Sequence, residues 1–90
     1  MKHAGQQTLD RLEPLLQQLR AFDGLKEKSR GCFYVKSKGF LHFHEHGDGE
    51  IWADIGLGAQ FDRLPAMTAA QHKALLKITK KTVDRLATKK

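Results

Sequence analysis

Three of the five histidines in this chain lie within five residues of one another. His42, His44 and His46 occupy alternate positions, and alternate side chains of a β-strand lie on one side, about 6–7 Å apart. A His-x-His pair on a strand is suited to bind one divalent metal ion, zinc above all. The strand pairing that we favour places Asp54 opposite His42 and Cys32 opposite His44, which would complete a zinc-like set of nitrogen, sulfur and oxygen ligands. The sequence therefore offers His42, His44 and Asp54 as zinc ligands, and zinc is the only cofactor that it suggests.

The same predicted face carries three aromatic side chains, Tyr34, Phe40 and Trp52. In the absence of a metal, the histidines would pack against these rings as ordinary cross-strand neighbours. With Lys36 and Lys38 beside them, the rings also resemble a single-stranded nucleic-acid platform, on which bases stack and lysines contact phosphates. An exposed face of this kind can instead bind a protein partner or a second copy of the chain. If a helix covers this face, the rings belong to the core.

Charge is distributed unevenly along the chain, which has 16 Lys and Arg, 10 Asp and Glu, and a formal net charge of +6. Residues 1–72 hold nine basic and nine acidic side chains, whereas the last eighteen residues hold seven basic ones against Asp84 alone. A segregated positive excess favours contact with a polyanion at that segment. The alternative is a charged helix face that only keeps a small domain in solution. We interpret the chain as a non-enzymatic binding module, without catalytic residues, that contacts nucleic acid or another polyanion through a C-terminal helix bearing Lys73, Lys77, Lys80, Lys81 and Arg85.

Leucines at spacings of three and four residues predict an amphipathic helix from Thr8 to Phe22. Thr8 is the expected N-cap, and Gly24 is the expected terminator. Pro14 is expected to kink this helix or to start a second one. Residues 25–30 have the composition of a charged connector.

Three strands are predicted over residues 32–35, 40–45 and 50–55. Three-residue loops at 37–39 and 47–49 join them, and the last glycine of each loop supplies a left-handed backbone conformation. These loop lengths determine the strand register. One face of the sheet is then apolar and is expected to carry both helices; it consists of Phe33, Val35, Leu41, Phe43, Ile51, Ala53 and Ile55.

That register pairs Phe33 with Phe43, and Phe43 with Ala53. Residues 60–64 are predicted to add a short edge strand. Thr68 and Gln71 form a capping-box pattern before the last helix. His72 falls among the apolar positions of that helix, where we expect a hydrogen-bonded core or boundary residue rather than a ligand. The apolar arc of the helix consists of Leu75, Ile78, Thr79, Thr82, Val83 and Leu86.

These elements predict an α+β fold: a single small domain over residues 1–90, in the order α-β-β-β-(β)-α, with an antiparallel meander sheet and terminal amphipathic helices. Residues 1–7 and 88–90 are expected to fray. A chain of 90 residues supports one modest core and no deep catalytic cleft. The single cysteine excludes an internal disulfide. Because the sequence contains no secretory signal and no membrane span, we expect a cytoplasmic, bacterial-type protein.

A resemblance is carried by the block Phe40-Leu41-His42-Phe43-His44-Glu45, which follows a lysine-rich turn and precedes Ala53-Asp54-Ile55. Together with the Thr-capped helix, it resembles a group of small bacterial proteins for which no activity is established. The resemblance covers residues 31–87 and implies the fold without adding chemistry. The meander also resembles, in its pattern, the hairpin region of YjbR-type proteins, some of which are suspected of contacting DNA.

Overall fold

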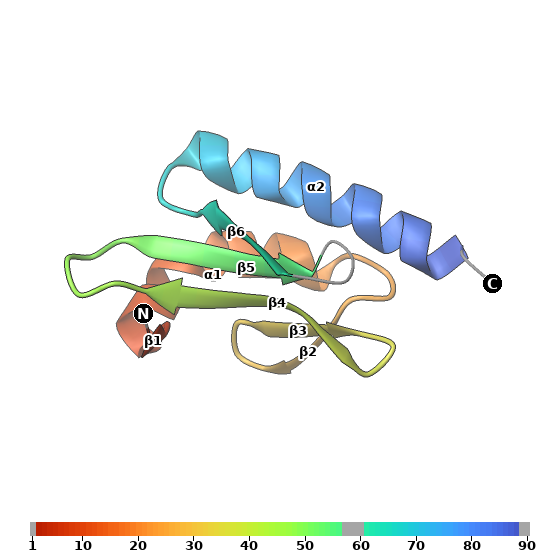
Figure 1. The fold of residues 1–90 in the computed structure, drawn as a ribbon, viewed down its shortest axis with the longest axis horizontal. Helices are drawn as coiled ribbons and strands as arrows, with labels where there is room; N and C mark the ends of the chain where they lie inside the picture. Colours follow the sequence, from red (N-terminus) through yellow and green to blue (C-terminus); the bar gives the residue numbers. More distant parts are fainter. Residues whose placement is uncertain (1, 57–60, 89–90) are drawn as a thin grey trace.

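In the residues that the computed structural model describes, 2–56 and 61–88, six strands form one antiparallel sheet and two helices pack on it (Figure 1). Five strands follow the order β2-β3-β4-β5-β6, and β1 pairs with β4. The α+β meander fold predicted from the sequence is thereby confirmed. The elements are β1 (Lys2–His3), α1 (Gln6–Arg20), β2 (Lys26–Ser29), β3 (Cys32–Val35), β4 (Lys38–Glu45), β5 (Ile51–Gly56), β6 (Phe61–Pro65) and α2 (Ala69–Thr88).

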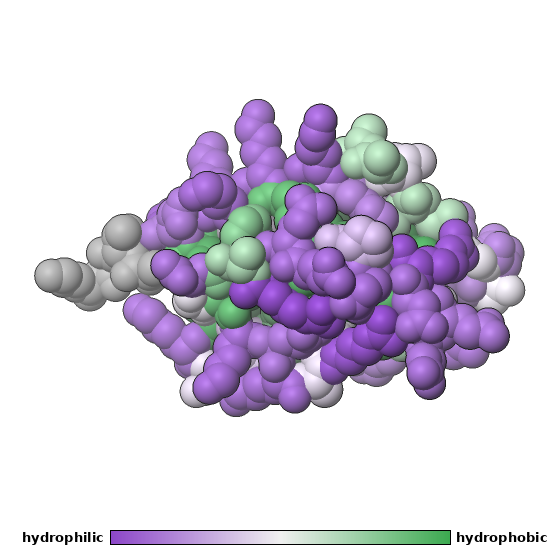
Figure 2. Space-filling model, turned by 180° about the vertical axis from the view of Figure 1, so that it is seen from behind, coloured by the Kyte–Doolittle hydropathy of each residue, from purple (hydrophilic) through white to green (hydrophobic). Residues whose placement is uncertain are grey.

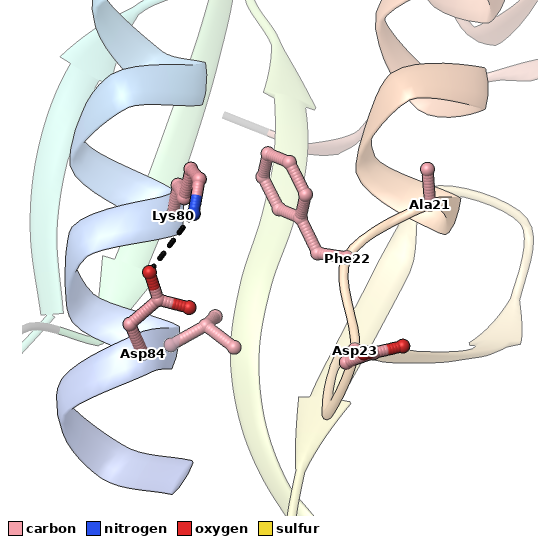
Figure 3. Close-up of a pocket in the computed structure, with 6 residues that line it drawn as sticks. Ala21, Phe22, Asp23, Lys80 and Asp84 are labelled. Atoms are coloured by element: carbon pink, nitrogen blue, oxygen red, sulfur yellow. Dashed lines mark hydrogen bonds and ion pairs between the residues drawn. The ribbon is translucent and has the colours of Figure 1, made fainter. Parts of the chain in front are cut away.

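Both helices lie on the same side of the sheet, as the sequence predicts. Figure 3 shows α1 and α2 side by side with strands of the sheet behind them. All seven sheet residues expected on the apolar face are buried, and they share one core with Leu12, Leu16 and Leu19 of α1 and Leu75 and Val83 of α2. No helix in the described part of the chain is long and apolar enough to cross a membrane.

Strand β1 occupies the place beside β4 that β3 leaves free. Strand β3 pairs with β4 only as far as His42, whereas Lys2 and His3 pair with Glu45 and His44. Of the seven residues that the sequence predicts to fray, Lys2 and His3 form β1, and Gln6 and Gln7 begin α1. The first residue and the last two lie outside the described residues.

Helix α1 begins at Gln6, two residues before the expected cap Thr8. The reason lies in β4: the Gly5 N–H donates to Glu45 Oε2 over 2.6 Å, so a strand side chain caps the helix. This hydrogen bond, followed by one from the Thr8 hydroxyl, holds the pKa of Glu45 below its ordinary value. Pro14 lies on the exposed side of one continuous helix, and no second helix begins there.

Strand β2 replaces the charged connector predicted over residues 25–30. Gly31, at φ +81°, turns the chain back on itself, and its N–H donates to Glu27 Oε2 over 2.9 Å. Lys26 then pairs with Tyr34, and Glu27 pairs with Phe33. A strand rich in charged residues is typical of a sheet edge, where its side chains meet solvent.

The turn between β3 and β4 is tighter than the predicted three-residue loop. Lys36 and Ser37, at φ 51° and 70°, form a two-residue turn, and Gly39 does not supply the left-handed position. As a result, Phe33 pairs with Leu41 and not with Phe43.

A β-bulge at Phe40 restores the apolar pattern of β4 after this turn. Tyr34 pairs with Gly39 while Phe33 pairs with Leu41, so Phe40 is the extra residue on β4. A bulge re-aims the side chain that it inserts. Phe40 is only 3 % exposed, and its placement on the open aromatic face is therefore wrong. Burial of this ring stabilises the bulged register by roughly 1.5–3 kcal/mol.

Predictions for the rest of the sheet are confirmed. Phe43 pairs with Ala53, and Gly49 takes the left-handed conformation at φ +94°. Strand β6 lies at the sheet edge beside β5, although residues 57–60, which include the start expected for this strand, lie outside the described residues.

Helix α2 starts with the predicted capping box. The Gln71 N–H donates to Thr68 Oγ1 over 3.1 Å, and the Thr68 N–H donates to Gln71 Oε1 over 3.0 Å. His72 Nε2 lies 2.8 Å from the Ala66 carbonyl oxygen, so this histidine is the hydrogen-bonded boundary residue that the sequence predicts. The side chain of Leu86 lies outside the described part of the structure.

Candidate nucleic-acid interface

The outer surface of α2 carries the five basic residues selected from the sequence. All five are exposed, whereas Leu75, Thr79 and Val83 are buried on the opposite side of the helix. At a rise of 1.5 Å per residue, the basic residues span about 18 Å along the axis. Figure 2 shows hydrophilic side chains projecting along the upper edge of the molecule, where α2 lies. We call this set the α2 basic face: Lys73, Lys77, Lys80, Lys81 and Arg85.

Three lysines of the α2 basic face make no electrostatic contact within the described structure. No ion pair or hydrogen bond among the described residues engages Lys73, Lys77 or Lys81. Lys80 Nζ lies 3.0 Å from Asp84 Oδ2 on the next turn, and both side chains are mostly exposed. An exposed pair at this spacing contributes only about 0.3–0.5 kcal/mol. Its lysine is therefore easily drawn to a stronger anionic partner.

Two arginines near the other helix, Arg20 and Arg30, are paired with acids. Arg20 contacts Glu13 and Glu27, and Arg30 contacts Asp10 and Glu13. Hydrogen bonds from Arg20 and then Arg30 lower the pKa of Glu13 to about 2. These arginines are occupied by partners within the fold, so the surface beside α1 does not match the α2 basic face.

A groove lies between the end of α1 and the second half of α2 (Figure 3). Its volume is about 250 Å³, below the range of roughly 300–1,000 Å³ usual for small-molecule sites. The Lys80–Asp84 pair lies on one wall. The polar groups of that wall are thus paired with each other, and we assign no ligand to the groove. It is lined by Ala21, Phe22, Asp23, Lys80, Val83 and Asp84.

Neither helix covers the second face of the sheet, which carries the histidines of β4 (Figure 1). His42, His44, Trp52 and Asp54 are all partly buried there. The prediction that Asp54 lies opposite His42 is confirmed. The prediction that Cys32 lies opposite His44 is wrong: Cys32 pairs with His42, because the turn between β3 and β4 is shorter than expected.

Asp54 is held by two partners on this face. His44 Nε2 lies 3.0 Å from Asp54 Oδ2, and Arg63 Nε donates to Oδ1 over 2.9 Å. The hydrogen bond from Arg63 keeps the pKa of Asp54 below its ordinary value, so the carboxylate is ionised at neutral pH. Burial, and then the neighbouring His44, lower the pKa of His42, which is neutral at that pH.

The predicted zinc ligands His42, His44 and Asp54 do not bring their donor atoms to one point. Among the described residues, one group of three has its donor atoms within 4.8 Å of one another: His46, Asp48 and Glu50. All three are exposed on the turn between β4 and β5, and exposed acidic groups of this kind are common without an ion. This turn therefore carries no metal assignment.

Sequence reasoning missed three residues of the open face: His3, Phe61 and Arg63. The ring of His3 lies 4.8 Å from that of His44, and the ring of Phe61 stacks on His42 at 5.1 Å between centroids. No pattern could have revealed His3, because a two-residue strand has no periodicity. Alternation along β6 would have placed Arg63 on this face.

Two of the three predicted aromatic residues remain on the open face. Tyr34 and Trp52 are half-buried there, and Lys28 Nζ lies 4.8 Å from the centroid of the Tyr34 ring. Lys36 and Lys38 beside Tyr34 are exposed. With Phe40 in the core, this aromatic surface is smaller than predicted, and one of its rings already has a cation over it.

Comparisons of the chain with protein-family models, with curated proteins and with solved structures gave no match.

Proposed function

We propose that this domain binds nucleic acid through the α2 basic face and catalyses no reaction on it. The observation that carries the proposal is the state of Lys73, Lys77 and Lys81, which are exposed and enter no ion pair among the described residues. They stand on a helix whose opposite side is anchored in the core by Leu75 and Val83. The helix thus holds a row of cations in place for a polyanion.

Phosphate contact accounts for this arrangement better than base recognition does. A lysine ammonium is a point charge on a flexible stem, whereas base edges are usually read by bidentate arginine, asparagine or glutamine. We therefore expect binding that is largely independent of sequence and sensitive to salt. Each phosphate contact releases counterions and contributes about 0.7 to the log–log salt slope for a single strand, or about 0.9 for a duplex.

The test compares two triple variants of equal charge. Lys73→Glu/Lys77→Glu/Lys81→Glu alters the α2 basic face, and Lys26→Glu/Lys28→Glu/Lys36→Glu alters the lysines around Tyr34. Each variant lowers the formal net charge from +6 to zero, so the two differ only in where the charge is removed. Binding of a short, labelled, mixed-sequence strand is followed by fluorescence anisotropy between about 50 and 200 mM salt.

We expect the α2 variant to lose at least about tenfold in affinity and roughly two units of salt slope, because three contacts are removed. The control variant should retain most of both. Equal losses in the two variants would mean that net charge alone governs binding, and a larger loss in the control would place the contact at Tyr34. Either result would overturn the proposal.

A further inference from the structure

The geometry points to a divalent transition-metal site on the open face of the sheet, with His3, His42 and His44 as ligands and Asp54 as the outer partner of His44. This site is separate from the α2 basic face and goes beyond the proposed function. It differs from the ligand set predicted from the sequence, because a residue of β1 replaces the carboxylate.

Backbone pairing gathers these three histidines from two strands. His3 lies directly opposite His44 in the β1–β4 ladder, and His42 is two positions from His44 along β4. Directly opposite residues have their Cβ atoms about 4.5–5.5 Å apart, and the diagonal neighbour is within reach of a long side chain. All three side chains therefore start from one side of the sheet, and their approach depends on no loop.

The rings of these three histidines lie near the spacing that a metal ion requires, although their donor atoms, like those of His42, His44 and Asp54, do not all lie within 4.8 Å of one another in this structure. Centroids lie 4.8 Å apart for His3 and His44, 6.2 Å for His42 and His44, and 6.3 Å for His3 and His42. Three imidazoles bound at 2.0–2.1 Å in tetrahedral geometry would place their centroids about 5 Å apart. One pair already meets this distance. His42 is almost equally far from the other two rings, so an inward turn of this one side chain closes both remaining gaps.

Contacts around His42 define what must change. Its ring stacks on Phe61, and its Nε2 lies 3.2 Å from the point where a side chain on Gly39 would begin. A residue larger than glycine at position 39 would reduce the space around the His42 ring. Metal binding must therefore draw His42 away from Phe61 toward the other two histidines.

Asp54 supplies an independent indication that points to metal binding. Ligating histidines usually donate their second ring N–H to a carboxylate, which fixes the tautomer and the ring orientation. His44 Nε2 lies 3.0 Å from Asp54 Oδ2, and Arg63 holds the other carboxylate oxygen. With its proton on Nε2, His44 presents the lone pair of Nδ1 as a ligand. A set of three imidazole nitrogens leaves a fourth position for water, and it suits Zn²⁺, Co²⁺ or Ni²⁺.

The experiment titrates the full chain, free of any polyhistidine tag, with Zn²⁺ by calorimetry and with Co²⁺ by visible absorption. In NMR spectra of the unsubstituted chain, zinc should change the chemical shifts of the imidazole nitrogens of His3, His42 and His44. The shifts of His46 and His72 should not change. We expect one ion per chain, and a zinc-dependent rise in the unfolding midpoint.

Variants separate this site from the turn between β4 and β5. His3→Gln and His44→Gln should each weaken zinc binding at least about tenfold, and Asp54→Asn about 10- to 100-fold, as loss of an outer partner does. The matched controls His46→Gln and Asp48→Asn should leave binding unchanged. Absence of binding, an effect of His46→Gln as large as that of His3→Gln, or zinc affinity unchanged in His3→Gln would overturn the inference.

Discussion

Helices α1 and α2 are both amphipathic, but they use their polar sides differently. On α1, Glu13 joins Arg20 and Arg30 in a network that reaches β2 through Glu27. On α2, Lys80 pairs with Asp84 of the same helix. Both helices bury a leucine-containing stripe against the sheet, so the contrast lies in their outer surfaces.

This contrast shows that the location of a binding surface depends on which charges are already paired. Arg20 and Arg30 add to the net charge as much as Lys77 and Lys81 do, yet their charge is matched by acids within the fold. Lys77 and Lys81 enter no ion pair among the described residues, so they are available to a partner. Ion pairs from Arg20 connect α1 to Glu27 of β2. Lys77 and Lys81 make no such connection between α2 and the sheet among the described residues.

The largest effect on stability is expected where the chain between β2 and β3 packs against α1. Gly31 has φ +81°, and a Cβ there would lie 2.6 Å from Leu9 Cδ2. Gly31→Ala should destabilise the fold by about 2–4 kcal/mol, from the backbone conformation and from overpacking. Gly24, at φ +87°, faces Val83 of α2 at 3.6 Å, an ordinary contact, so Gly24→Ala should cost only about 1–2 kcal/mol. Urea unfolding gives the free energy of unfolding of both variants. Equal losses of this free energy would contradict the tighter packing of Gly31 against α1.

Acid should weaken the docking of α1 while the α2 basic face stays charged. The pKa of Glu13 is about 2 in the fold against an ordinary 4.5, so the unfolded chain takes up the proton first as the pH falls. Burial alone would raise the pKa of Glu27, but hydrogen bonds from Arg20 and the Gly31 N–H leave it below its ordinary value. Stability from these acids is therefore present above pH 4.5 and is lost as the pH falls toward about 2.

The measurement is the unfolding midpoint as a function of pH for the wild type and for Glu13→Gln. The variant should have the lower midpoint at neutral pH and a shallower decline between about pH 4.5 and 2. Parallel curves would show that the network around Glu13 does not stabilise the fold.

Two threonines on the buried side of α2 differ in whether their hydroxyl groups have a hydrogen-bond partner. Thr79 Oγ1 is buried and has no hydrogen-bond partner among the described residues, whereas Thr82 Oγ1 donates to the Ile78 carbonyl over 2.9 Å. Thr79→Val should raise stability by about 1 kcal/mol, because an unpaired buried hydroxyl is removed. Thr82→Val should lower it by about 0.5–1.5 kcal/mol. Thermal unfolding of the two variants is the comparison, and a change of the same sign in both would refute this assignment.

The smallest effect is expected at the Lys80–Asp84 pair. Lys80→Gln should lower stability by only about 0.3–0.5 kcal/mol, because both side chains are exposed. Arg20→Gln is the counterpart on α1 and should lower the unfolding midpoint by several times as much, since Glu13 and Glu27 each lose one of their two partners. Matching shifts in the two variants would remove the distinction between the helices.

The α2 basic face could be predicted from the sequence because helical spacing alone separates Lys77 and Lys81 from Leu75 and Val83. The β4–β5 register could be predicted because Gly49 supplies the left-handed residue of a three-residue loop. Both depend on local rules, which the structure confirms.

Features that depend on several segments at once could not be predicted. The β3–β4 turn places Lys36 and Ser37 at positive φ, which neither residue type signals, and the bulge that buries Phe40 compensates for it. The charged residues of β2 show no alternation of apolar and polar types. The position of His3 depends on the space that β3 leaves beside β4, so its imidazole could not be assigned to the open face from the sequence.

The most direct test of nucleic-acid binding by α2 is an amide chemical-shift titration with short, mixed-sequence DNA and RNA strands at low and at moderate salt. We predict shifts concentrated between Lys73 and Arg85 that diminish as salt is added. Shifts centred on Tyr34, His42 and Trp52, or none with either polymer, would contradict the proposal. Shifts centred on Tyr34, His42 and Trp52 would place the contact on the open sheet. Absence of shifts with both polymers would leave the α2 basic face as a solvated surface.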